Sequence, residues 1–187
     1  MKTFVIFDLE ATCYDDSRKD EVKPYGFVNE IIEIGAVKLD HTGKEIDRFS
    51  KFAQPILFPN VSNFCTELTT ITQEDVDNAE TLEKVLEDFL NWCDGCVLVS
   101  WGHYDKTQIL KDMVRNDLDL PHYEDIMEDH HSLKHLHAEW NNLKKKRGIG
   151  MGGALRMEGI KLEGTHHRGI DDAINIAKIF RKYIDRF

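Results

Sequence analysis

The sequence lacks a long apolar run and an excess of positive charge. No stretch is long enough to cross a bilayer, so we expect no membrane partner and predict a cytoplasmic protein. The formal net charge is −10. A protein that holds nucleic acid mainly through its own charge is expected to be basic. A nucleic-acid partner therefore requires bound cations or a local basic patch, and the one basic cluster, Lys144 to Arg147, is typical of a solvated helix end.

Cysteine is scarce, with four residues in the chain. Two of them, Cys93 and Cys96, form a Cys-x-x-Cys motif that suggests a thiol redox protein. In that motif a strand comes first and a helix follows, because the helix N-terminus lowers a thiol pKa. Here a predicted helix, Thr81–Trp92, precedes the motif and a predicted strand, Val97–Trp101, follows it. The order favours reduced structural thiols, and a zinc site would need a second Cys pair that we do not find.

The sequence also has no internal repeat, low-complexity segment or linker. Its 187 residues, 41% apolar and 31% charged, are within the range of one globular unit. We therefore predict a single domain over residues 1–187.

The first third of the chain predicts three antiparallel strands. A Val-, Ile- and Phe-rich run over Thr3–Thr12 is typical of a buried strand. Residues 14–29 predict a long polar loop. Strands are then expected over Glu30–Leu39 and Glu45–Gln54, joined as a hairpin by a turn at Thr42 and Gly43.

The remainder predicts mainly helices. Residues 55–72 are expected to be irregular, with Thr72 and Asp75 capping a short helical turn. After the helix and strand around the Cys-x-x-Cys motif, no clear element is expected over residues 123–134. Further helices are predicted over Asp105–Asn116, Leu136–Lys146, Ala154–Glu158 and from Ile170 to the end. A mixed sheet of antiparallel and parallel strands, flanked by helices, fits this order, so the fold class is α/β.

Two acids close the first predicted strand. Asp8 and Glu10 are two residues apart, so both side chains point to the same face. Adjacent carboxylates repel each other, and partial burial strengthens the repulsion. A bound cation would remove it, and hard oxygen ligands favour Mg²⁺ or Mn²⁺ over zinc. On these two residues alone, a strand ending in solvated acids is an equal alternative.

Two further acids occupy equivalent places later in the chain. Asp105 lies just past the predicted central strand, and Asp172 lies in the first turns of the last helix. Strand ends and helix starts gather at one edge of an α/β sheet, so all four acids can converge there. Two divalent ions roughly 3.5–4 Å apart would make such a group a centre for phosphoryl transfer.

His167 is expected on the loop before the last helix, because Gly164 and Gly169 flank it. From that loop it could overhang the metals and accept a proton from water near neutral pH. Taken alone, one His among nine is more often a solvated loop residue.

These residues carry a family resemblance. The motifs are FDLEAT at residues 7–12, NEIIEIG at 29–35, FCTELTTIT at 64–72, Asp105, and HRGIDDA at 167–173. Together, over nearly the whole chain, they resemble the DEDDh 3′-to-5′ exonucleases of the RNase H-like fold. Within these the chain is most similar to the branch of the 3′ histone-mRNA exonucleases and KapD-type proteins.

The resemblance implies a role for each matching residue. Asp8, Glu10, Asp105 and Asp172 would bind two Mg²⁺ ions, which Mn²⁺ could replace, and His167 would be the general base. His166 and Asp171 have the same spacing as His167 and Asp172, but the family pattern continues as His-x-Gly and so favours the second pair. Residues expected at the terminal nucleotide are Glu10, Ala11, Thr12, Glu67, Leu68, Ile71 and His167.

The implied activity is release of nucleoside 5′-monophosphates from the 3′ end of single-stranded nucleic acid, with RNA preferred over DNA. The sequence contains no appended nucleic-acid-binding domain, so specificity would come from the catalytic domain or from a protein partner. The alternatives are the same chemistry on single-stranded DNA and a catalytically inactive module that binds nucleic acid or protein.

Overall fold

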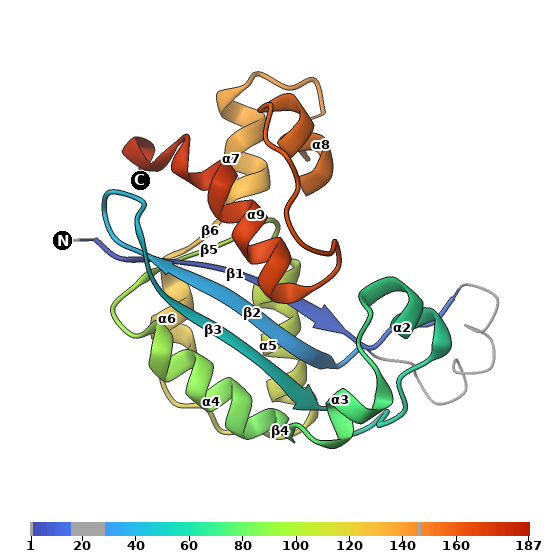
Figure 1. Cartoon of the computed structure of the whole chain (residues 1–187). Coiled ribbons are helices and arrows are strands. Elements are labelled where there is room, and N and C mark those ends of the chain that lie inside the picture. Colours follow the sequence, from blue (N-terminus) through green and yellow to red (C-terminus); the bar gives the residue numbers. More distant parts are fainter. Residues whose placement is uncertain (1, 16–28, 146) are drawn as a thin grey trace.

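The computed structural model describes residues 2–15, 29–145 and 147–187. Most of the loop predicted over residues 14–29 lies outside this part. A six-stranded sheet with the order β4-β3-β2-β1-β5-β6 runs through the molecule (Figure 1). Its strands are β1 (Phe4–Ala11), β2 (Ile31–Leu39), β3 (Glu45–Gln54), β4 (Glu80–Thr81), β5 (Val97–Ser100) and β6 (His130–Ser132).

The sheet is mixed, as predicted. Strands β1, β2 and β3 pair antiparallel, and β2 and β3 form the expected hairpin. Strand β5 pairs parallel with β1, and β6 pairs parallel with β5. The helices are α2 (Asn63–Thr69), α3 (Gln73–Asp77), α4 (Leu82–Cys93), α5 (Tyr104–Arg115), α6 (Tyr123–Glu128), α7 (Leu133–Trp140), α8 (Met151–Met157) and α9 (Gly169–Arg181), followed by the 3₁₀ turn η3 (Ile184–Arg186).

Helices cover both faces of the sheet, with α7, α8 and α9 on one side and α4, α5 and α6 on the other (Figure 1). The alternation of strand β1 explains this arrangement, because successive side chains point to opposite faces. Phe4 packs against Phe180 of α9, with ring centroids 5.0 Å apart. Phe7 packs against Phe89 of α4, with centroids 5.5 Å apart. The apolar stripe of α4 thus fills one core, and that of α9 fills the other.

The structure corrects several predicted element boundaries. The segment expected to be irregular contains helix α2, in which Ser62 caps Cys65 N and the side chains of Cys65 and Thr69 are buried. Residues 123–134 form α6, β6 and the start of α7 rather than an ill-defined region. Helix α7 ends at Trp140, so the prediction of a helix to residue 146 was wrong. The capping box at Thr72 and Asp75 is confirmed and begins α3.

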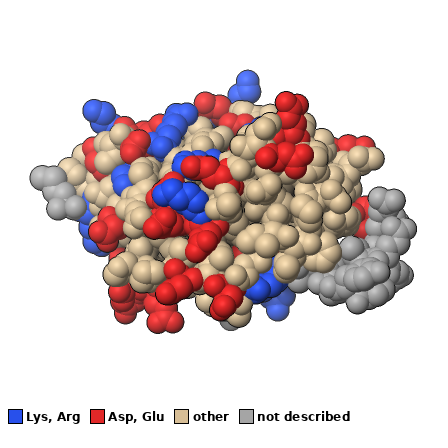
Figure 2. All heavy atoms as spheres, turned by 90° about the horizontal axis from the view of Figure 1, so that it is seen from below, with Lys and Arg blue, Asp and Glu red and all other residues tan. Residues whose placement is uncertain are grey.

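Charge of both signs is spread over the face that Figure 2 shows, on which acidic and basic side chains intermingle. Among the ion pairs of the described residues, Lys51 and Lys84 both contact Asp88. Lys144, Lys145 and Arg147 follow the end of α7 and are exposed. No helix in the described ranges has the length and apolarity needed to cross a membrane.

Candidate active site

The acids at the end of β1 continue its alternation. Phe4 and Ile6 pack in the core on the α9 side, so Asp8 and Glu10, two and four residues further on, point to that same side. A register shift between Glu10 and Ala11 interrupts the pairing with β2 there. Such bulges redirect side chains and are common next to active sites. Asp8 and Glu10 are partly buried and line an open cleft.

Asp105 reaches β1 because the neighbouring strand stops early. The parallel pairing of β1 with β5 ends at Phe7 opposite Ser100, so Leu9 has no partner on β5. The Leu9 amide instead donates to Asp105 Oδ1 at 3.3 Å. Asp105 lies in the first turn of α5 and is 4% exposed. This backbone hydrogen bond places its carboxyl group beside the end of β1.

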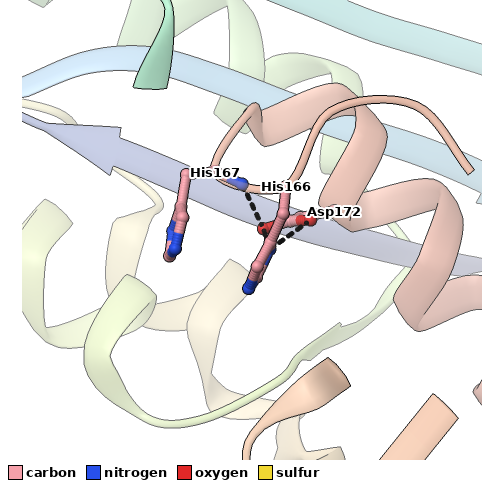
Figure 3. A group of neighbouring side chains, drawn as sticks. All are labelled: His166, His167 and Asp172. Atoms are coloured by element: carbon pink, nitrogen blue, oxygen red, sulfur yellow. Dashed lines mark hydrogen bonds and ion pairs between the residues drawn. The ribbon is translucent and has the colours of Figure 1, made fainter. Parts of the chain in front are cut away.

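Asp172 lies in the first turn of α9, beside His166 on the preceding loop (Figure 3). Its Oδ2 accepts from the His167 amide at 3.1 Å and lies 2.9 Å from His166 Nδ1. The His167 backbone is left-handed, with φ of 66°. The two imidazole rings stack with centroids 3.9 Å apart. Both rings lie on the loop before α9, where His167 was expected, and line the cleft.

The structure separates the two acids that the sequence left ambiguous. Asp172 has a carboxylate oxygen within 4.8 Å of ligand atoms of both Asp8 and Glu10. Asp171 instead accepts a hydrogen bond from the Thr165 amide at 2.7 Å and therefore supports the loop. Asp172, rather than Asp171, is the acid placed with the pair on β1.

Burial raises the pKa of every acid in this group, and repulsion from neighbouring carboxylates adds to the effect at Asp8 and Glu10. Desolvation raises the pKa of Asp8 well above its ordinary value, and the charges of Asp105 and Glu10 add to the effect. Burial, followed by repulsion from Asp172, raises the pKa of Glu10 to about 8. Burial raises the pKa of Asp105 to about 6 and also raises that of Asp172. The carboxylates together are unstable as anions unless positive charge joins them.

The donor set fits divalent cations. Within the described residues, no side chain donates a hydrogen bond to the carboxylates of Asp8 and Glu10, so their oxygens remain available to a cation. Asp8, Glu10 and Asp172 each offer an oxygen, and these ligand atoms lie within 4.8 Å of one another. An all-carboxylate set of this kind suits Mg²⁺ or Mn²⁺. These residues would hold the ions, with Asp105 beside them.

A fifth acid in this region has its own cation, which sequence reasoning missed. Glu33 on β2 is 1% exposed at its side chain and is paired with Arg168. The two contacts measure 3.1 Å from Arg168 Nε and 3.2 Å from Arg168 Nη2. Glu33 also accepts from the Gly169 amide at 2.9 Å. The pair therefore fastens the histidine loop and the first residue of α9 to the sheet.

Two glycines allow this close approach of α9 to β2. A Cβ atom on Gly35 would lie 2.0 Å from the carbonyl carbon of Gly169. One on Gly169 would lie 3.0 Å from the Gly35 amide nitrogen. A larger residue at position 35 would push the start of α9, and with it Asp172, away from β1. The sequence signal for this contact was a glycine within each of the motifs NEIIEIG and HRGIDDA.

The residues predicted to contact nucleotide differ in exposure. Glu67 and Leu68 lie on the exposed side of α2. Ile71 is fully buried, and Thr12 is 1% exposed and accepts a hydrogen bond from the Glu30 amide. Ala11 is 8% exposed, and its carbonyl oxygen lies 3.8 Å from Cys65 Sγ on α2. The cleft also contains residues that were not predicted as site residues, namely Trp101, Gly102, Tyr104, Lys134, Gly150, Met151 and Ile176.

All four cysteines are free thiols. Cys93 ends α4 and Cys96 precedes β5, so the helix-before-strand order predicted for this motif is confirmed. Burial raises the pKa of both thiols. The arrangement does not supply the lowered thiol pKa that dithiol redox chemistry uses.

Comparison with known proteins places the chain among exonucleases. A family model described as Exonuclease (RNase_T) matches residues 5–180. ERI1 exoribonuclease 3 of Homo sapiens is 34% identical over 196 residues, which are 95% of this chain and 52% of the relative. The 3'-5' exoribonuclease 1 of Homo sapiens is 32% identical over 186 residues, 93% of this chain and 50% of the relative. The chain thus spans about half the length of these two relatives.

Solved structures agree with the family match. The nuclease domain of 3'hExo, described as a DEDDh family member bound to rAMP, superposes with a TM-score of 0.86 at 26% identity, over 99% of this chain and 92% of that one. A 3'-exonuclease studied for 3'-end specific recognition of the histone mRNA stem-loop gives 0.84 at 26% identity, over 99% and 82%. The predicted resemblance to DEDDh exonucleases and the predicted RNase H-like fold are confirmed.

Proposed function

Because this chain belongs to the RNase T exonuclease family, we propose that it is a metal-dependent 3′-to-5′ exoribonuclease. The observation that carries the proposal is the meeting of Asp8, Glu10, Asp105 and Asp172 at the end of β1, with His167 lining the same cleft. The names of the relatives, ERI1 exoribonuclease 3 and 3'-5' exoribonuclease 1, support the same activity. We propose that residues 1–187 act as one exonuclease domain, and a cytoplasmic location stays a prediction.

Each residue has a defined task in this proposal. When bound, two Mg²⁺ ions, or Mn²⁺ in their place, would polarise the scissile phosphodiester and lower the pKa of water. Asp8, Glu10, Asp105 and Asp172 hold the ions. His167 accepts the proton of the attacking water. Burial and the neighbouring His166 lower the pKa of His167, so its ring is neutral and able to accept a proton at neutral pH.

The substrate follows from the position of the site. An open cleft admits a chain end, and hydrolysis of the last phosphodiester would release a nucleoside 5′-monophosphate. Single strands are favoured because the terminal base must leave its stack to enter. We propose that Glu10, Ala11, Glu67 and Leu68 contact the terminal nucleotide, while the buried side chains of Thr12 and Ile71 support the strand and helix that carry them. A protein partner could add specificity.

The test is a degradation ladder. Single-stranded RNA and DNA of one sequence, labelled at the 5′ end, are incubated with the protein and Mg²⁺, Mn²⁺ or a chelator. We expect shortening from the 3′ end, faster on RNA, and none with chelator. The RNA-to-DNA ratio of rates assigns the sugar preference, since a contact to the 2′-hydroxyl distinguishes the two. A higher rate on DNA would replace the RNA proposal with the alternative of a deoxyribonuclease.

His167 gives the sharpest control of the mechanism. His167→Ala should lower kcat by about 10²–10⁴-fold, the usual contribution of a general base. His131→Ala serves as the matched variant. His131 lies on β6, outside the proposed site, and its Nε2 is 2.9 Å from Asp129 Oδ1. Equal activity of wild type and His167→Ala would remove the general base from the proposal. No ladder with either metal would refute the exonuclease activity itself.

A further inference from the structure

His166 has no task in the proposed mechanism, although it lies directly beside His167. The ring planes differ by 18° and the centroids are 3.9 Å apart. His166 Nδ1 contacts both carboxylate oxygens of Asp172, at 3.1 and 2.9 Å. Figure 3 shows the two rings and the Asp172 carboxylate gathered on one side of the loop. The sequence therefore places two imidazoles where the acids alone would suffice for Mg²⁺.

Imidazole nitrogen changes which metal a site prefers. Oxygen ligands suit Mg²⁺ and Mn²⁺, whereas imidazole suits zinc and its neighbours, which bind more tightly at mixed sites. Zinc takes His nitrogen and carboxylate oxygen at about 2.0–2.2 Å, and two His with one carboxylate is a known set that leaves one position for water. His166, His167 and Asp172 each offer a ligand atom within 4.8 Å of the other two.

We propose that His166, His167 and Asp172 form a zinc-binding site that overlaps the carboxylate site at Asp172, and that zinc bound there inhibits the enzyme. Zinc binding follows from this juxtaposition alone. Inhibition rests on the proposed function, because zinc would occupy the nitrogen with which His167 accepts a proton and would withdraw Asp172 from the Mg²⁺ ions. The site is thus a regulatory one, responsive to the ratio of zinc to magnesium.

The side chains have the freedom that ligation requires. Stacked rings direct their nitrogen lone pairs side by side, so each ring must turn about its Cβ–Cγ bond for the nitrogens to converge. The His166 side chain is 44% exposed, which leaves room for this rotation. The contact between His166 Nδ1 and the Asp172 carboxylate already holds these two ligands close together. On zinc binding, the bonds from both groups to the metal would replace this contact.

Direct binding tests the site without substrate. Calorimetric titration of the full chain with Zn²⁺, in constant excess Mg²⁺, should give a tight site in wild type that weakens by at least about tenfold in His166→Ala. His41→Ala is the matched control, since His41 lies in the exposed turn between β2 and β3 and should leave the affinity unchanged. Equal zinc affinity in wild type and His166→Ala would overturn the proposal.

Cobalt distinguishes this site from the cysteines. Co²⁺ in place of Zn²⁺ should give visible bands of a four-coordinate site with nitrogen and oxygen ligands, and these should be lost in His166→Ala. Near-ultraviolet charge-transfer bands from thiolate ligands would instead assign the metal to a cysteine pair and would refute the histidine site.

Inhibition is measured on the labelled RNA, with each variant compared with its own zinc-free rate. The zinc concentration for half-inhibition should rise at least about tenfold in His166→Ala and stay unchanged in His41→Ala. Loss of zinc binding in His166→Ala, in a protein without nuclease activity, would support the site while refuting the proposed function. Zinc binding that depends on His166 but leaves the rate unchanged would overturn the inhibitory role.

Discussion

Two groups of acids lie within this sheet and its helices, one buried and one partly buried, and they differ in their partners. Glu30, Glu33 and Asp112 are each satisfied by the protein. Asp8 and Glu10 accept no hydrogen bond from a side chain of the described residues. Burial is costly for a charged carboxylate without a partner, so the second group is stable in its ionised form only with a bound cation. The comparison separates acids that hold the fold together from the acids that we propose to bind metal.

The satisfied acids show how completely the chain can neutralise a buried carboxylate. Glu30 accepts three successive backbone amides, from Ile56 at 3.1 Å, Leu57 at 2.9 Å and Phe58 at 2.7 Å. Asp112 on α5 accepts the Ile31 amide and pairs with Arg115, both at 2.9 Å. Each fixes a segment that flanks the site. The absence of similar partners at Asp8 therefore points to a position reserved for a cation.

Replacing one acid from each group should give the largest difference in activity and stability between the two groups. Asp8→Asn should lower the exonuclease rate by about 10²–10³-fold or more, because a charge that holds the ions at the reacting phosphate is lost. The same change should stabilise the metal-free protein, since repulsion within the cluster falls. Glu30→Gln is the matched variant and should destabilise the fold while retaining kcat in the folded fraction. Exonuclease assays measure the rates, and thermal unfolding measures the stabilities. Equal losses of rate in the two variants would contradict the distinction between metal-binding and structural acids.

Disruption of the ion pair between Glu33 and Arg168 should have the next largest effect, on the free energy of unfolding. Arg168→Ala leaves Glu33 buried without its cation and should cost about 3–5 kcal/mol in the free energy of unfolding. Glu33→Gln should cost less, about 1–2 kcal/mol, because Arg168 can turn toward solvent. Urea denaturation of the two variants tests this order. If Glu33→Gln proved the more damaging change, the pair would not act through the buried carboxylate.

A change of pH should have a smaller effect on the stability of the metal-free protein. The raised pKa of Glu10, about 8, and of Asp105, about 6, mean that the metal-free folded state holds more protons than the unfolded chain. Stability should therefore fall as pH rises from about 4, where these carboxyl groups lose their protons in the unfolded chain, to about 8, where Glu10 loses its proton in the folded state. Saturating Mg²⁺ should reverse this trend, since binding favours the deprotonated carboxylates. Thermal melts of wild type and Asp8→Asn, with and without Mg²⁺, measure it, and a metal-free melting temperature that rose over this range would refute the raised pKa values.

Strand periodicity made much of this fold predictable. The alternation of Thr3–Thr12 predicted that Asp8 and Glu10 share a face, and the sheet-edge rule predicted that Asp105 and Asp172 would approach them. The order of helices and strands around the Cys-x-x-Cys motif was also correct. These features depend on local spacing and on general topology, both of which a single sequence carries. The roles assigned to the site residues stay predictions.

Other features depend on contacts between distant residues and left little local signal. Helix α2 forms in a segment rich in Thr because Cys65 and Thr69 pack into the interior and Ser62 caps it. The partner of Glu33 lies 135 residues away, at Arg168. The burial of Ile71 depends on packing against Ile32 and Val76, which the spacing within its own motif does not reveal.

Counting bound ions would test the central claim most directly. Mn²⁺ binding to the full chain at pH 8, followed by electron paramagnetic resonance and calorimetry, should give two ions per chain in wild type. Asp8→Asn should lose at least one of them, whereas Glu30→Gln should retain both. Binding of no Mn²⁺ by wild type, or the same two ions in Asp8→Asn, would contradict the proposal that Asp8 and Glu10, at the end of β1, form a metal site.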